Sequence, residues 1–185
     1  MSENANSSSV NIRKSYINLE WLNKHLHLSV MFITVFLVFS SPWLFMSRKL
    51  TSHGSWINVA HVYLGIVVTF LSLCFLIIHC INGYWKQFFP WLKGDISPLK
   101  NDLKNIFKGR FPVAGGRGLF SCIEGIGLLT LLATGLTGCL WFAIQGTTDA
   151  MYWRSIHSHF AVGFIVYLGM HFVCALSHCL AFLRN

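Results

Sequence analysis

Nine histidines occur in this 185-residue chain, and several of them lie within long apolar stretches. An ionisable side chain inside a membrane-spanning helix is costly, so it marks a candidate functional site. His157 and His171 are fourteen residues apart, which on a helix is only about 40° short of four full turns. They share one helix face, about 21 Å apart along its axis. Histidines that face each other across two helices can hold a b-type haem through both axial positions of its iron.

Four apolar stretches are long enough to position these histidines in a bilayer, whose hydrocarbon core needs about 20 residues of helix. They cover residues 28–46, 57–81, 119–144 and 155–183. The alternating hydrophobicity of a transmembrane β-barrel is absent from the sequence. The composition agrees, with 54% hydrophobic and 11% charged residues, against about 25% charged in a soluble domain. It excludes a water-soluble enzyme, a disordered regulator and a collagen-like fibre. We expect an all-α membrane protein whose four transmembrane helices form an up-down bundle.

The polar segments are expected to flank this bundle. Residues 1–20 are rich in serine and asparagine, which predicts a disordered tail ahead of a helical domain over 21–185. Residues 97–109 place apolar side chains on one helix face and lysines on the opposite face, which predicts an interfacial helix. Contact with anionic headgroups is favoured over partner docking for this helix. A cleavable signal peptide with its core at 28–39 is disfavoured, because the apolar run is long and no A-x-A-like site follows it.

The distribution of lysine and arginine predicts the orientation. Eleven of these residues lie on the side that holds both termini and the segment between the second and third helices, and three lie on the other side: Arg48, Lys49 and Arg154. Cytoplasmic segments carry the excess of positive charge, so both termini are expected to be cytoplasmic.

This orientation pairs the histidines at two depths. The second and fourth helices both run inward, so His61 lies level with His157 near the outer surface. His27 opens the first helix on the cytoplasmic side, level with His171. Two pairs at matching depths predict two b-type haems held by four axial ligands. A zinc site is disfavoured because four clustered ligands would be needed. Histidine pairs without any cofactor are also disfavoured, because both pairs would have to match in depth by accident.

Three further side chains are candidates for supporting roles. His79 lies about five turns along the helix from His61, so it is an alternative cytoplasmic ligand or part of a quinone pocket. Glu124, the acidic residue within a predicted span, could exchange protons with a quinone or orient a ligand histidine. The alternative, a carboxyl group that only bridges two helices, is favoured equally. Arg154, three residues before His157, is a candidate partner for a haem propionate.

Three segments of the sequence resemble the bacterial di-haem cytochromes b of the b561 type. The second helix carries His61 and Gly65 in an H-x-x-x-G segment, the fourth has His157 and His171 at their fourteen-residue spacing, and the first begins at His27. Leu28 stands where the family has tryptophan. The family includes the cytochrome b subunits of nickel–iron hydrogenases and formate dehydrogenases, and the superoxide oxidase. The resemblance covers residues 21–183 and implies the same four ligands that the geometry selects.

The resemblance implies a protein of the bacterial inner membrane, in contact with lipid, that carries electrons between a quinone and a periplasmic redox partner. No nucleic-acid partner is expected, because the positive charge follows the membrane topology. Two alternatives stay open. One is a superoxide:ubiquinone oxidoreductase, favoured by the short chain, although Glu124 stands where that enzyme would have a histidine. The other is a haem-bearing anchor subunit of a periplasmic dehydrogenase or hydrogenase, disfavoured because the outer loops are short. The sequence does not decide between an enzyme and an electron-transfer component.

Overall fold

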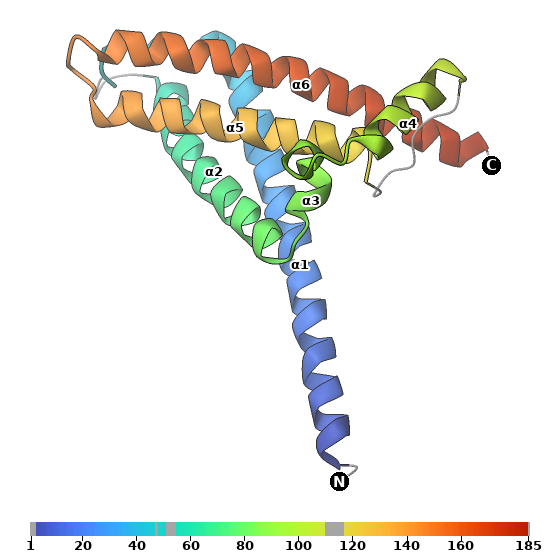
Figure 1. Ribbon diagram of the computed structural model, residues 1–185. Helices are drawn as coiled ribbons and strands as arrows, with labels where there is room; N and C mark the ends of the chain where they lie inside the picture. The colour runs from blue at the N-terminus through green and yellow to red at the C-terminus, as the bar shows by residue number, and fades with distance from the viewer. Residues whose placement is uncertain (1–2, 47, 51–54, 110–116, 185) are drawn as a thin grey trace.

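The structure, a computed structural model, describes residues 3–46, 48–50, 55–109 and 117–184 (Figure 1). All regular elements within these residues are helices. In chain order they are α1 (Glu3–Ser40), the 3-10 helix η1 (Ser41–Trp43), α2 (Trp56–Ile81), α3 (Trp85–Phe88), the 3-10 helix η2 (Pro90–Lys93), α4 (Ser97–Phe107), α5 (Leu119–Ala143) and α6 (Ala150–Arg184).

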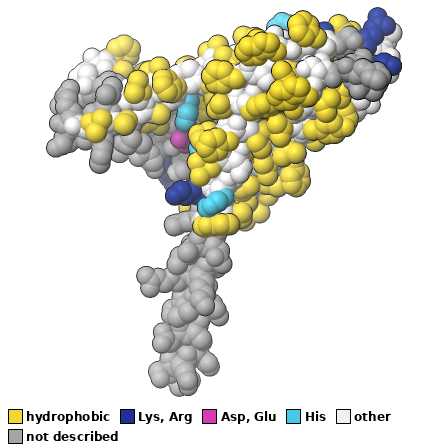
Figure 2. Space-filling view, turned by 180° about the vertical axis from the view of Figure 1, so that it is seen from behind, with side chains coloured by type: hydrophobic (Ala, Val, Ile, Leu, Met, Phe, Trp, Pro, Cys, Tyr) yellow, Lys and Arg dark blue, Asp and Glu magenta, His cyan; other side chains and the backbone are white. Residues whose placement is uncertain are grey.

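Four helices in the described part of the chain are long and apolar enough to cross a membrane. The crossing segments are Trp21–Trp43, Trp56–Ile81, Leu119–Ala143 and Ala150–Ser177. The expectation of an all-α protein with four long apolar helices is therefore confirmed, and the chain is a multi-pass membrane protein by the length and composition of its helices. Figure 2 shows hydrophobic side chains over most of one face of these helices, with lysine and arginine at the margins.

The first helix begins earlier than the sequence predicts. Residues 3–20, expected to belong to a disordered tail, continue α1 as regular helix, while residues 1–2 lie outside the described residues. Once the apolar part of α1 is helical, extending it needs no new nucleation, because each added residue forms one more backbone hydrogen bond. The helix ends at Ser40, and Pro42 lies in the 3-10 turn that follows.

The spanning helices form two antiparallel pairs. Helix α1 packs against α2, α5 packs against α6, and the two pairs meet through α2 and α5. Figure 1 shows the pairs close together at the end that carries the α1–α2 and α5–α6 connections, which we call the connection end. They diverge towards the opposite end. The order of contacts thus follows the chain, as expected for short connections between neighbouring antiparallel helices.

Hydrogen bonds between the two connections hold the connection end together. The amide of Gly146 donates to the carbonyl oxygen of Arg48 at 2.8 Å, and the amide of Leu50 donates to Oε1 of Gln145 at 3.0 Å. Beneath them, the buried side chains of Val62, Trp141 and Ala150 form a core cluster with apolar neighbours from both helix pairs. These hydrogen bonds and this cluster join the two helix pairs at the connection end.

The opposite end is filled by the short α3 and η2 segments. Phe88, Phe89 and Pro90 are buried there, and α3 packs against α5. Gly125 of α5 permits this approach, because a Cβ atom at that position would lie 3.0 Å from the carbonyl carbon of Phe88. The aromatic segment between α2 and α5 therefore separates the helix pairs where they diverge.

Asn58 is expected to contribute strongly to the stability of the connection end. Its side chain is 3% exposed; Oδ1 accepts from the amide of Phe45 at 3.3 Å, and Nδ2 donates to the carbonyl oxygen of Phe45 at 3.1 Å. We expect Asn58→Ala to lower the free energy of unfolding by about 1–3 kcal/mol, because both backbone groups of Phe45 lose their partner. Unfolding by denaturant in detergent micelles measures this. Asn82→Ala, which removes an exposed bond to Ile78, is the control, and equal losses would contradict the role of Asn58.

Candidate cofactor site

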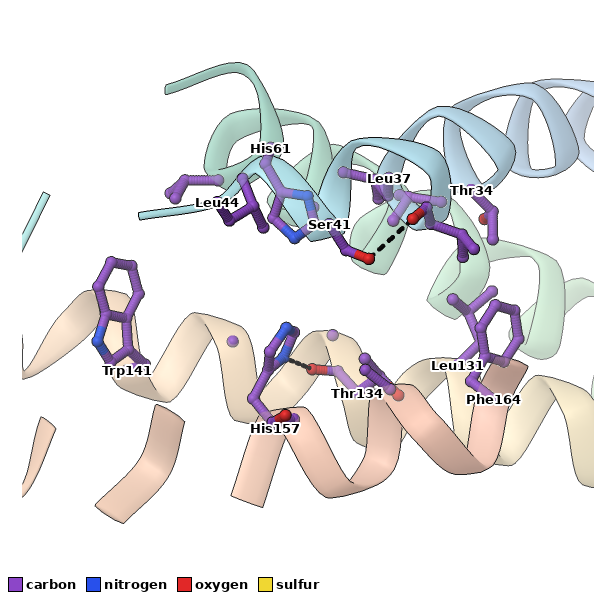
Figure 3. Close-up of a pocket in the computed structure, with 18 of the residues that line it drawn as sticks. Thr34, Leu37, Ser41, Leu44, His61, Leu131, Thr134, Trp141, His157 and Phe164 are labelled. Carbon is purple, nitrogen blue, oxygen red and sulfur yellow. Dashed lines mark hydrogen bonds between the residues drawn. The ribbon is translucent and has the colours of Figure 1, made fainter. Parts of the chain in front are cut away.

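A cavity of about 350 Å³ lies among the four spanning helices near the connection end. Its volume is within the range of about 300–1,000 Å³ that is usual for ligand sites. Apolar side chains dominate its walls. The residues labelled in Figure 3 are Thr34, Leu37, Ser41 and Leu44 from α1 and the segment after it, His61 from α2, Leu131, Thr134 and Trp141 from α5, and His157 and Phe164 from α6.

His61 enters the cavity from α2 and is held by the end of α1. Its Nδ1 lies 3.3 Å from the hydroxyl oxygen of Ser40, and the same hydroxyl donates to the carbonyl oxygen of Leu37 at 3.1 Å. Because the hydroxyl proton is directed to Leu37, its oxygen is left to accept a proton from Nδ1. This arrangement favours the tautomer in which Nδ1 carries the proton and Nε2 has a free lone pair.

His157 enters from α6 and is held by the backbone of α5. Its Nδ1 lies 2.8 Å from the carbonyl oxygen of Thr134, and a carbonyl can only accept, so Nδ1 carries the proton. The hydroxyl of Thr137 donates to the same carbonyl at 2.8 Å. Gly138 leaves room for the ring, since a Cβ atom there would lie 3.1 Å from Nδ1. The lone pair of His157 is also on Nε2.

The two imidazoles point towards one another from opposite walls of the cavity (Figure 3). Histidines that ligate metals usually donate their other N–H to a carbonyl or similar acceptor, which fixes the ring and raises its basicity. Both histidines have this arrangement. Within the described residues no group of three or more histidine, cysteine or acidic side chains could hold a metal ion. These two histidines could therefore hold a metal only together with ligands that other groups supply.

Four features of the cavity lining bear on whether a flat haem group could be held there. Gly65 lines the wall one turn from His61, and a Cβ atom at Gly65 would have no neighbour within 4 Å, so a ring system can approach its backbone. Thr34 Oγ1 and Trp141 Nε1 are buried without a hydrogen-bond partner in the described part of the chain, and both residues line the cavity. Arg154 of α6 also lines the cavity, and its side chain is exposed, so it is available to a carboxylate.

A second group of histidines lies away from this cavity, towards the opposite end. The ring of His27 is 6.2 Å from that of Phe75, and Nδ1 of His79 is 2.9 Å from the carbonyl oxygen of Phe75. The shared neighbour Phe75 places His27 near His79, and the choice of His171 over His79 as its partner stays a prediction.

Glu124 lies beside this second group. It is exposed on α5, and Tyr167 of α6 packs against the same helix at Gly127, where a Cβ atom would overlap the tyrosine ring. The ring of Tyr167 is 5.6 Å from that of His171. Tyr167 was not among the residues expected from the sequence, although its place four residues before His171 puts it on the same helix face. Ser40 and the Thr134 carbonyl were missed as well, and no residue pattern marks a backbone acceptor.

His25 and His159 do not line the cavity. Each is exposed, and its Nδ1 lies close to the carbonyl oxygen four residues earlier in its own helix: Trp21 at 2.8 Å for His25, and Ser155 at 2.7 Å for His159. The expectation that these two histidines are not ligands remains a prediction. Substitutions of His25 and His159 can therefore serve as controls for substitutions of the candidate ligands.

Comparisons of the chain with family models, curated proteins and solved structures find no match. The resemblance to the b561-type cytochromes therefore rests on the sequence motifs alone.

The bond between His157 and Thr134 can be tested in the protein without any cofactor. We expect ¹⁵N NMR of labelled histidine to show His157 with a protonated Nδ1. Gly138→Ala should weaken this signature, because the added methyl group crowds the ring. Gly163→Ala, at a site with open space around its Cβ position, is the control, and His157→Gln identifies the signal. An unchanged tautomer population in Gly138→Ala would show that the carbonyl does not hold the ring.

Proposed function

We propose that this protein is a di-haem b-type cytochrome that carries electrons across the bacterial inner membrane between a quinone and a periplasmic redox partner. The observation that carries the proposal is the pair His61 and His157, which face each other across a cavity with both Nδ1 atoms hydrogen-bonded. Facing imidazoles between helices are a common way to hold a b-type haem.

At the connection end, His61 and His157 would hold the iron of one haem. When bound, the haem supplies reversible one-electron chemistry at its iron. The contribution of the chain is to bind and orient. Ser40 and the Thr134 carbonyl hold the Nδ1 protons, which directs both Nε2 lone pairs into the cavity. Arg154 would neutralise a propionate, with the indole N–H of Trp141 as a second donor. The apolar walls exclude water and so influence the potential.

Near the opposite end, His27 and His171 would hold the second haem, with His79 as the alternative to His171. Since His157 and His171 lie about 21 Å apart along α6, the two sites would sit near the two surfaces of the membrane. The positive-inside rule favours a periplasmic connection end and a cytoplasmic second site. Glu124 and His79 would lie where a quinone gains or loses protons.

The amount of haem per chain tests the ligand assignment. We expect a pyridine haemochrome spectrum to give two b-type haems in the wild-type protein and about one in His61→Ala or His157→Ala. His159→Ala is the matched control, because that exposed histidine bonds only within its own helix, and it should retain both haems. For the second site, His27→Ala should lose one haem and His25→Ala should lose none. The absence of haem from well-folded wild-type protein would overturn the proposal.

Gly65 provides a test that leaves every histidine in place. We expect Gly65→Val to fill the open space beside His61 and to preserve the folded helices. The haem affinity of this site should fall by a factor of ten or more, which corresponds to a loss of about 1.4 kcal/mol or more in binding free energy. Gly163→Val adds the same side chain to α6, at a glycine that also has open space around it. Haem titration of the cofactor-free proteins measures both affinities. Equal affinities would show that the haem does not pass in front of Gly65.

A further inference from the structure

The amphipathic helix α4 is fixed in its rotation by a contact with the start of α5. Oδ2 of Asp102 accepts a hydrogen bond from the amide of Leu119 at 2.8 Å. Gly118 makes room for this contact, because a Cβ atom there would overlap the Asp102 carboxylate. A carboxylate is favourable at the positive end of a helix. Asp102 therefore faces α5, and this contact determines which side of α4 points away from the protein.

The side that points away combines apolar and positive residues, which corrects the expectation that the lysines lie on the face opposite to the apolar side chains. Lys100 and Lys104 are each about 160° around the helix from Asp102, and Phe107 is about 140° from it. Both lysines are exposed, Phe107 is 85% exposed, and Leu103 is 49% exposed. Trp91 and Leu92 of η2 add exposed apolar surface at 42% and 66%. We call the four α4 residues Lys100, Leu103, Lys104 and Phe107 the outward face.

The charge of the outward face selects the kind of partner. Lys100, Lys104 and Lys108 are exposed, whereas the two acidic residues nearby are engaged with backbone amides. Asp102 bonds to Leu119, and Oδ1 of Asp95 accepts from the amide of Ser97 at 3.3 Å. A second copy of this face would bring like charges together, so it is disfavoured as the occupant. An occupant with negative charge and an apolar layer is complementary.

The position of α4 completes the argument. The helix is attached at Leu119, the first residue of the candidate membrane span in α5, and the end of a spanning helix is expected at the boundary between hydrocarbon and water. We propose that α4 lies on the membrane surface and binds anionic phospholipids: Leu103 and Phe107 enter the interface, and Lys100 and Lys104 bind the phosphate groups. Lysines beside apolar residues on an interfacial helix extend their ammonium groups to the headgroups in this way.

Lipid binding by the full chain in neutral detergent tests the proposal. The probe is phosphatidylglycerol with a fluorescent acyl chain, and its affinity is compared with that of phosphatidylcholine carrying the same label. We expect a preference for phosphatidylglycerol that falls about 25-fold in the double variant Lys100→Gln/Lys104→Gln, since each lysine near a surface contributes about five-fold. The control is Arg48→Gln/Lys49→Gln, which removes two exposed charges at the connection end and should change the affinity less than two-fold.

The other outcomes overturn the proposal. Equal losses in the two double variants would show that only the overall charge of the protein matters. An unchanged affinity in Lys100→Gln/Lys104→Gln would leave the outward face to another partner. Displacement of the labelled lipid by inorganic phosphate would indicate an ion site instead of a lipid surface, and a change in oligomeric mass would indicate a second copy. Circular dichroism of each variant confirms that the helices are intact, and Phe107→Ser should weaken binding of the labelled phosphatidylglycerol without altering the net charge.

Discussion

A histidine inside a membrane span has two ring nitrogens and no water to hydrogen-bond with them, and the candidate site depends on how this requirement is met. His25, His79 and His159 bond to the carbonyl four residues earlier in the same helix. His61 and His157 instead bond across to other helices, at Ser40 and Thr134. A bond within one helix leaves the ring lying along that helix, whereas a bond across helices holds the ring in the space between them. The second arrangement makes a binding site.

The cross-helix bonds require the helices to approach closely, and small residues permit this. Gly138 lets the ring of His157 reach the backbone of α5, and Gly135 faces Thr69 of α2 so closely that a Cβ atom there would overlap its hydroxyl group. At the connection end, the hydrogen bonds between the two loops maintain this approach. At the opposite end α3 separates the pairs, and His27 is exposed. The two ends therefore differ in how firmly they position their histidines.

Much of this arrangement could be predicted from the sequence, because hydropathy and helix periodicity are properties of single segments. The four apolar helices and the shared depth of His61 and His157 follow from counting residues along each segment. The hydrogen-bond partners could not be predicted, since every residue offers a carbonyl and only the packing of α6 on α5 selects that of Thr134. The insertion of α3 could not be predicted for the same reason, because nothing in the sequence around Phe88 indicates that it packs against Gly125 of α5. The extension of α1 was missed because composition does not reveal where a helix already formed will stop.

The cavity has walls from both halves of the chain, and this determines when it can exist during biogenesis. The hairpin of α1 and α2 supplies His61 and Ser40, and the hairpin of α5 and α6 supplies His157 and Thr134. The first hairpin leaves the ribosome well before the second, because the α3–α4 segment separates them in the chain. Until the second hairpin has been inserted and docked, the first has only half of a binding site. A ligand that needs both walls can therefore be loaded only after both hairpins have been inserted and have docked.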